Sequence, residues 1–150
     1  MNAIVLDSGP LGLIVHKAGV KAADDCRTWL AGHIVRGVRV VVPEIIDFEL
    51  RRELLRLVKH SALADLEAFE VQTSDRFLPL TTLVLRHAAV LWADARRQGY
   101  PTAAPHELDV DVILAAQALS LELPPSQFIV ATSNPVHLSR FVPADTWQNI

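Results

Sequence analysis

Short apolar runs alternate along the chain with longer segments in which apolar residues recur every three or four positions. Continuous apolar runs are typical of strands buried on both faces of a parallel sheet, whereas the longer periodicity indicates helices. Strands are expected at residues 3–6, 39–42, 77–80 and 128–131. Helices are expected at residues 10–17, 22–36, 43–60, 62–72, 81–98 and 111–121. This alternation predicts an α/β fold.

Length and composition place the chain among compact globular proteins. Its 150 residues are 51% hydrophobic and 21% charged, which favours one domain over residues 1–150 with a proper core. A stretch at 99–108 contains two prolines and is expected to be a long, functional loop. With one cysteine, neither a disulfide framework nor a cysteine-rich zinc site is expected. The chain shows neither a signal peptide nor a membrane-spanning stretch, so we expect a cytoplasmic protein that does not enter a membrane.

An acidic residue follows the first apolar run directly. Asp7 comes after residues 3–6, and Gly9 and Pro10 then mark the start of a new helix. Open α/β folds bind ligands at the carboxyl ends of their strands, where Asp7 is expected to lie. The alternative is that Asp7 or Ser8 only caps the helix.

Two glutamates border the apolar stripe of the helix expected at 43–60. Glu53 lies about 20° from that stripe's nearest member and Glu49 about 60° from it. A carboxylate beside a core needs a partner, either a metal ion or a positively charged side chain. Arg52 and Arg56 each follow one of the glutamates by three residues, so surface ion pairs are the alternative explanation.

Asp109 and Asp111 precede an apolar run that ends at Leu119. A helix that is apolar nearly all round is buried, and a carboxylate at its amino end is stabilised by free backbone NH groups. One of the two acids is expected to cap this helix and the other to act as a ligand, unless both only start the helix. After the last apolar run come Thr132 and Asn134, which reach the same sheet edge as Asp7 if both strands are parallel.

The order and spacing of four motifs resemble those of a PIN domain of the VapC-like branch over nearly the whole chain. The motifs are Asp-Ser after the first strand, Phe-Glu-Leu-Arg-Arg-Glu-Leu around Glu49, Asp-Val-Ile-Leu-Ala-Ala-Gln-Ala from Asp111, and the late Val-Ala-Thr-Ser-Asn. The resemblance implies a three-layer α/β/α domain with a central parallel sheet and a metal-dependent ribonuclease site.

Carried over to this sequence, the resemblance implies catalytic, metal-binding roles for Asp7, Glu49 and Asp111. Ser8, Thr132 and Asn134 would be supporting polar residues, and Asp109 and Glu53 would lie in the next shell. Mg²⁺ or Mn²⁺ is the expected cofactor, because hard ions prefer carboxylates and water. Many relatives have a further acid shortly after Asn134, whereas this chain has His137, which puts a second metal in question.

The partners implied are an RNA substrate, a small antitoxin protein and a second copy of the chain in a homodimer. A net charge of −3 argues against coating nucleic acid by bulk charge, so RNA contacts would be local. Arg52, Arg96 and Arg97 are the candidates for these contacts. The function expected is that of an endoribonuclease toxin. The alternative is a non-catalytic or weakly active RNA-binding or regulatory protein.

Overall fold

The computed structural model describes residues 1–99 and 105–150, and its centre is a parallel sheet of five strands. The strands are β1 (Ala3–Leu6), β2 (Arg39–Pro43), β3 (Phe77–Leu78), β4 (Phe128–Thr132) and β5 (Ala144–Thr146), in the order β3-β2-β1-β4-β5. In the central strand, Val5 pairs with Val41 on one side and Val130 on the other. All four residues of β1 are buried, because helices cover both faces of the sheet.

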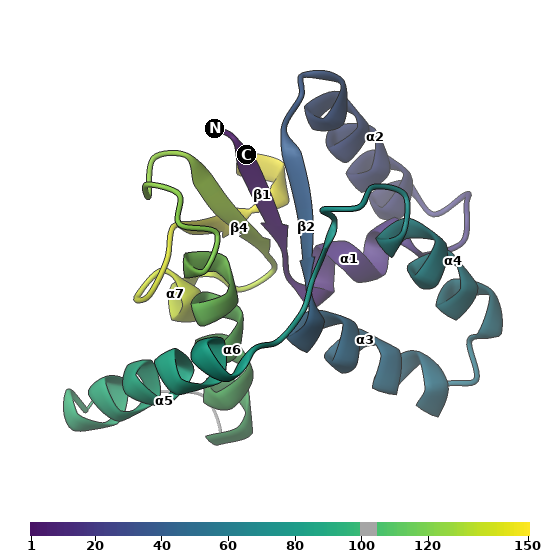
Figure 1. Ribbon diagram of the computed structural model, residues 1–150. Coiled ribbons are helices and arrows are strands. Elements are labelled where there is room, and N and C mark those ends of the chain that lie inside the picture. The colour runs from purple at the N-terminus through teal and green to yellow at the C-terminus, as the bar shows by residue number, and fades with distance from the viewer. Residues whose placement is uncertain (100–104) are drawn as a thin grey trace.

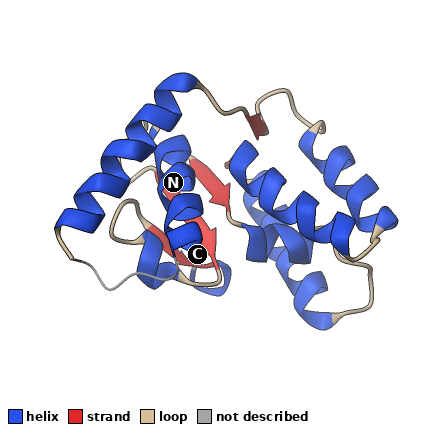
Figure 2. Cartoon of the chain, turned by 90° about the horizontal axis from the view of Figure 1, so that it is seen from below, coloured by secondary structure: helices blue, strands red, loops and turns tan. Residues whose placement is uncertain are grey.

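The helices of the described residues form the outer two layers of a three-layer α/β/α arrangement (Figures 1 and 2). They are α1 (Ser8–Ile14), α2 (Lys21–Val35), α3 (Glu44–Arg56), α4 (His60–Glu70), α5 (Thr82–Arg97), α6 (Pro105–Leu119) and α7 (Pro135–Leu138), with a final 3₁₀ turn at Trp147–Asn149. In Figure 1, α2, α3 and α4 lie to the right of the strands, and α5, α6 and α7 to the left. None of the helices in the described ranges has both the length and the apolar character that a membrane crossing requires. The predicted α/β fold with a parallel sheet is confirmed.

The core follows from the apolar periodicity. Leu11, Ile46, Leu66 and Leu114 extend from four helices onto the sheet, and each is fully buried. Burial of each such side chain contributes roughly 1.5–3 kcal/mol to stability. A smaller apolar cluster joins α5 to α6, so α6 is buried on two sides.

The helix expected at 111–121 begins earlier, which corrects the predicted loop. The loop was expected at 99–108, but α6 starts at Pro105, while residues 100–104 lie outside the described residues. Proline suits a first helical turn because its missing NH would have no intrahelical partner there. Asp109 and Asp111 therefore both lie inside α6, and the expectation that one of them caps the helix is wrong.

A helix end and an edge strand also differ from the expectation. The helix expected at 43–60 ends at Arg56, where the chain turns through Val58 with a positive φ of 56°. The short edge strand β5 was not predicted. Its three residues are too few for a period of two to be recognised, and pairing with β4 holds them extended.

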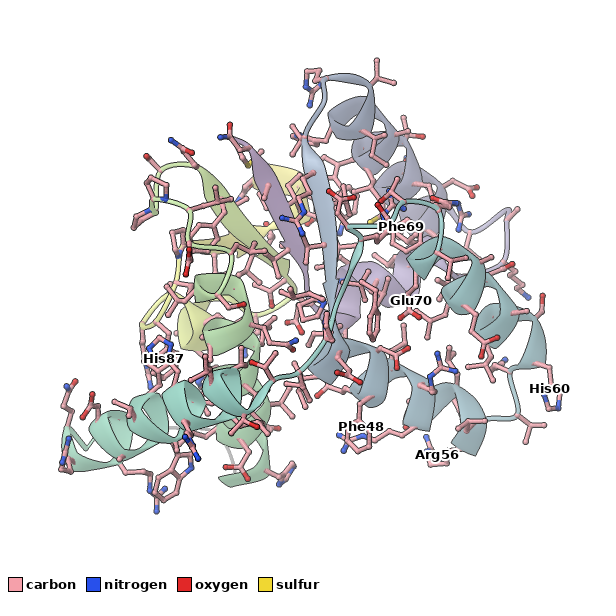
Figure 3. The ribbon with its side chains drawn as sticks, viewed as in Figure 1. Phe48, Arg56, His60, Phe69, Glu70 and His87 are labelled. Carbon is pink, nitrogen blue, oxygen red and sulfur yellow. The ribbon has the colours of Figure 1, made fainter. Side chains whose placement is uncertain are left out.

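A buried acid joins α3 to α4 (Figure 3). The Glu70 side chain is only 9% exposed, and its Oε2 lies 3.7 Å from Arg51 Nη2. Arg51 also binds Asp47 at 2.8 Å and Glu67 at 2.8 Å. Burial, together with a hydrogen bond and repulsion from Asp47, raises the pKa of Glu70 to about 8, although Arg51 opposes this rise.

Glu70 is expected to make stability fall as pH rises. The folded protein holds its proton up to about pH 8, whereas the unfolded chain releases it near 4.5. Between these values the unfolded state gains relative stability, by up to about 1.4 kcal/mol per pH unit from this group. Urea unfolding from pH 5 to 9 should show a flatter profile for Glu70→Gln. Glu67→Gln, one turn earlier on the exposed side of Arg51, removes only the smallest of the effects that raise this pKa and should keep a slope close to wild type. Equal slopes for wild type and Glu70→Gln would contradict this assignment.

Candidate functional site

Three acids converge at the carboxyl-terminal edge of the sheet. Asp7 directly follows β1, Glu49 lies in α3, which directly follows β2, and Asp111 lies in α6. In Figure 1 the arrowheads of β1 and β2 point toward α1 and α3, with α6 alongside. The structure thus brings together the three carboxylates that the sequence selected as ligand candidates.

Asp7 is fixed by hydrogen bonds on both carboxylate oxygens. The backbone NH of Ser8 donates to Oδ1 at 2.7 Å, and the hydroxyl of Thr132 donates to Oδ2 at 2.6 Å. Thr132 is 1% exposed, and its own hydroxyl accepts from the backbone NH of Asn134 at 3.1 Å. Asp7 is also the N-cap residue of α1, so the capping role and the place in the site belong to the same residue.

The pKa of Asp7 is raised above its ordinary value. Desolvation is the main cause, and the charge of Glu49 adds to it. The hydrogen bonds from Thr132 and Ser8 act in the opposite direction, because they stabilise the ionised form. Asp7 is therefore costly to ionise in the folded protein, and its hydrogen bonds hold the carboxylate in one orientation.

The pKa of Asp111 is also raised, to about 7. Desolvation is again the largest cause, followed by repulsion from Asp7 and Glu49. A nearby cation would stabilise the ionised form of Asp111, which burial and the neighbouring acids disfavour.

Two charged residues near Asp111 were not assigned to the site from the sequence. Glu107 raises the pKa of Asp111 and Arg140 lowers it. Glu107 lies four residues before Asp111 in α6, so the two side chains share one face of that helix. The sequence did not indicate this neighbour, because residues 99–108 were expected to form a loop and helical spacing does not apply in a loop. Arg140 follows α7 and had no sequence signal, since only the fold brings it to α6.

Glu49 is partly accessible, with 26% of its side chain exposed. Arg52 Nη2 lies 3.9 Å from Glu49 Oε2, and the Arg52 guanidinium lies 5.2 Å from the ring centroid of Phe48. An ion pair at that distance and exposure is worth about 1 kcal/mol or less. Arg52 therefore borders the site without neutralising it.

The two acids expected in the next shell lie elsewhere. Glu53 is 48% exposed and pairs with Arg56, so the expectation that it lies beside the core is wrong. Asp109 lines a shallow hollow of about 330 Å³ between α5 and α6, together with Trp92. It lies about 160° around α6 from Asp111, because two residues correspond to about 200° of helical rotation.

Arg96 and Arg97 lie on α5. The Arg96 guanidinium is 5.4 Å from the ring centroid of Trp92, and Arg97 pairs with Asp94. Their contact with RNA stays a prediction. His137 is partly buried in α7, three residues after Asn134, which is the N-cap residue of that helix.

The donor chemistry of the site fits a hard divalent cation. In residues 1–99 and 105–150, no three His, Cys, Asp or Glu side chains already form a complete ligand group. Asp7, Glu49 and Asp111 nevertheless offer only carboxylate oxygens, which Mg²⁺ and Mn²⁺ prefer. Each of the other two raises the pKa of Asp111, and a cation among them would reverse that effect.

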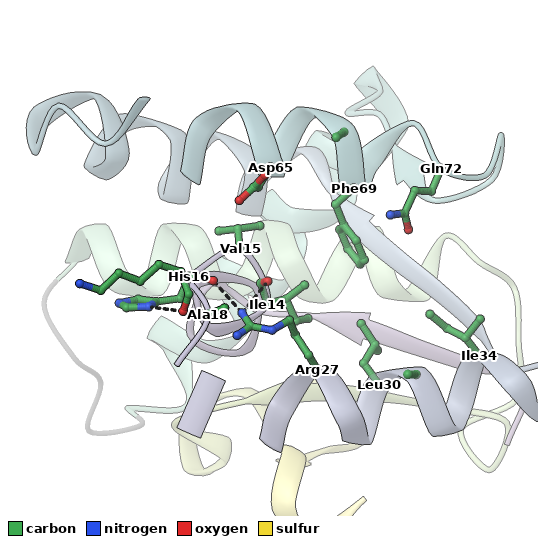
Figure 4. A pocket seen from close by; sticks show the side chains of 13 residues that line it. Ile14, Val15, His16, Ala18, Arg27, Leu30, Ile34, Asp65, Phe69 and Gln72 are labelled. Carbon is green, nitrogen blue, oxygen red and sulfur yellow. Dashed lines mark hydrogen bonds between the residues drawn. The ribbon is translucent and has the colours of Figure 1, made fainter. Parts of the chain in front are cut away.

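A separate hollow of about 500 Å³ lies between α2 and α4 (Figure 4). Its lining includes the apolar residues Leu30, Ile34 and Phe69, with Arg27 at the edge. The Arg27 guanidinium donates to the carbonyl of His16 at 2.7 Å, so it is occupied in holding the end of α1. None of the three converging acids lines this hollow.

Together, the central parallel sheet and the helices on both of its faces form a three-layer α/β/α PIN-like fold. Solved structures with this fold include chains from VapBC and FitAcB structures. The chain is similar to one from VapBC2 of Rickettsia felis bound to a DNA fragment from their promoter, with a TM-score of 0.73, 13% identity, and 97% of this chain and 98% of that chain covered.

Two further structures show the same likeness. FitAcB from Neisseria gonorrhoeae gives a TM-score of 0.68 at 20% identity, covering 98% of this chain and 99% of that chain. DNA-bound VapBC from Salmonella typhimurium gives 0.68 at 19%, with the same coverage. No protein-family model and no curated protein matches the chain. The resemblance seen in the sequence is confirmed for the fold.

Proposed function

We propose that this protein is a metal-dependent endoribonuclease that acts as the toxin of a toxin–antitoxin pair. The observation that supports this function best is the convergence of Asp7, Glu49 and Asp111, in which burial and mutual repulsion raise the pKa of Asp111 to about 7. Such a group of acids disfavours its own ionisation and gains stability from a divalent cation. A bound divalent cation can activate water for hydrolysis of a phosphodiester bond, so no protein nucleophile is required.

Asp7, Glu49 and Asp111 would hold Mg²⁺ or Mn²⁺. When bound, the ion would lower the pKa of a water molecule and offset the negative charge that grows in the transition state. The protein's own part is to hold Asp7 in one orientation, through the NH of Ser8 and the hydroxyl of Thr132. A rigid ligand is effective because no reorganisation is needed when the reaction occurs.

The RNA backbone would approach a site of negative charge and therefore needs nearby cations. Arg140 is close enough to lower the pKa of Asp111, and Arg52 lies beside Glu49. Guanidinium groups bind phosphate oxygens in a planar, two-pronged geometry. We assign both arginines to the RNA path near the carboxylates.

The partner is proposed to be a small antitoxin protein. The neighbours named above are complexes of the VapBC type, and this chain covers nearly all of the matched chain in each. A homodimer is proposed as well. Light scattering of the purified chain, alone and after co-expression with the product of a neighbouring small reading frame, would measure both assemblies.

Two glutamates one turn apart in α3 provide the decisive test. Glu49 faces Asp111 closely enough to raise its pKa, whereas Glu53 is half-exposed and paired with Arg56. Glu49→Gln is expected to lower the rate of RNA cleavage in Mn²⁺ at least about 30-fold, or about 2 kcal/mol. Glu53→Gln should stay within about twofold of wild type, and only Glu49→Gln should relieve growth arrest when the chain is expressed in cells.

Equal cleavage by both variants would overturn the assignment of Glu49. If wild type binds RNA but cleaves none of a varied set in Mn²⁺ or Mg²⁺, the non-catalytic RNA-binding interpretation would hold instead. The non-catalytic alternative rests on His137, because this chain has that histidine in the stretch where many relatives have a further acid.

A further inference from the structure

Gln117 is a fully buried amide inside the apolar part of α6. Gln117 is 0% exposed, and it is the one polar residue in the run Val-Ile-Leu-Ala-Ala-Gln-Ala-Leu. An amide removed from water is destabilising unless both its oxygen and its nitrogen find hydrogen-bond partners. The partners of Gln117 therefore indicate why an amide stands here.

The amide oxygen binds the first turn of α3. Gln117 Oε1 accepts from the backbone NH of Ile45 at 3.1 Å. The first NH groups of any helix lack partners within that helix, and a side chain usually provides one. Pro43, the N-cap residue of α3, makes no such bond. Gln117 therefore caps α3 from a different helix.

The amide nitrogen binds the edge of the sheet. Gln117 Nε2 donates to the carbonyl oxygen of Leu78 at 2.8 Å. Leu78 lies in β3, opposite Pro43 of β2. The carboxylate of Glu44 accepts from the NH of Leu80, which ties the same first turn of α3 to the segment after β3. One side chain of α6 thus fixes both α3 and β3.

We propose that Gln117 is a positioning residue that sets the spacing between Glu49 and Asp111. Glu49 lies four residues after Ile45, about 6 Å along α3, and Asp111 lies six residues before Gln117, about 9 Å along α6. Both helices are rigid over these lengths, so a shift at the amide displaces one carboxylate relative to the other. This inference rests on the proposed metal site.

The amide is better suited to this task than an apolar side chain. A methionine fills a similar volume, but it would leave the NH of Ile45 and the carbonyl of Leu78 without their present partner. It would also allow α3 to slide along α6, because apolar contacts have no preferred direction. The hydrogen bonds fix a register that packing alone leaves loose.

The test compares Gln117→Met with Leu66→Ala. Leu66 is a fully buried core residue of α4, so its truncation lowers stability without touching the amide bridge. Isothermal titration with Mn²⁺ alone is expected to show at least about fivefold weaker binding for Gln117→Met and a change within twofold for Leu66→Ala. Hydrogen exchange should also be faster at residues 44–49 in Gln117→Met, relative to α2 of the same protein.

Wild-type affinity for Mn²⁺ in a folded Gln117→Met protein would overturn the inference. Equal weakening by Leu66→Ala would overturn it too, because the effect would then be one of general stability. If wild type binds no Mn²⁺, the proposed function fails. Exchange at residues 44–49 then decides separately whether Gln117 holds α3 in place, and unchanged exchange there would refute that role.

Discussion

Asp7→Asn is expected to lower the rate of RNA cleavage at least about 100-fold, which corresponds to about 2.7 kcal/mol. The change keeps the shape of the side chain and an acceptor for the NH of Ser8, but it removes the negative charge that a divalent cation needs. Single-turnover cleavage of a labelled RNA in Mn²⁺ measures the effect. Asp25→Asn is the matched control, because Asp25 is half-exposed and pairs with Lys21 on the surface of α2.

The same substitution should not unfold the protein. The pKa of Asp7 is raised, so above its ordinary value of 3.8 ionisation costs the folded state more than the unfolded chain. In EDTA at neutral pH, Asp7→Asn is therefore expected to melt at or above the wild-type temperature. Mn²⁺ should raise the melting temperature of wild type and not of the variant, because only a bound ion adds stability. Cleavage retained by Asp7→Asn would contradict its place among the catalytic residues.

Gly9→Ala is expected to lower the free energy of unfolding by about 1–3 kcal/mol, the usual effect of overpacking. A Cβ at Gly9 would lie 2.0 Å from Ser133 Oγ, so that hydroxyl could not keep its position, and 3.1 Å from Ser133 Cβ, which would have to move by a few tenths of an ångström. Ser133 stands between Thr132 and Asn134, so its displacement would also disturb the hydroxyl that binds Asp7. Urea unfolding and the cleavage assay should both show a loss.

Gly12→Ala provides the control in the same helix. A Cβ there would meet Leu50 Cδ1 at 3.7 Å, an ordinary contact, so the higher helix propensity of alanine should leave stability unchanged or raise it by up to about 1 kcal/mol. Adding Ser133→Gly should restore much of the loss caused by Gly9→Ala, since it removes both atoms in conflict. Additive effects of the two changes would show that Ser133 is not the cause.

Four of the five strands could be predicted, and Asp7 could be selected as a ligand candidate, because their signals are local. Buried parallel strands need continuous apolar runs, so residues 3–6 and 128–131 stand out in the sequence. Asp7 follows such a run directly, and the direction of parallel strands sends it to the carboxyl-terminal edge without further information. The resemblance of four motifs to a PIN domain supplied the order in which Glu49 and Asp111 join it.

The surroundings of the acids could not be predicted in this way. Glu107 shares a helix face with Asp111 only because α6 begins at Pro105. Glu53 is half-exposed and pairs with Arg56, although its position in the sequence predicted a place beside the core. Helix boundaries depend on which backbone groups find partners, and for α3 the partner is Gln117, 72 residues away from Ile45 in the chain.

By itself, the sequence predicted the fold class, because periodicity and strand direction are properties of neighbouring residues. Its resemblance to a PIN domain selected the three acids as candidates. The tertiary structure alone decided which charges surround Asp111, which oxygen of Asp7 the Thr132 hydroxyl binds, and how α3 is held against α6. Those contacts join residues distant in the chain, and their energies depend on distance, burial and hydrogen-bond geometry, which exist only once the chain is folded.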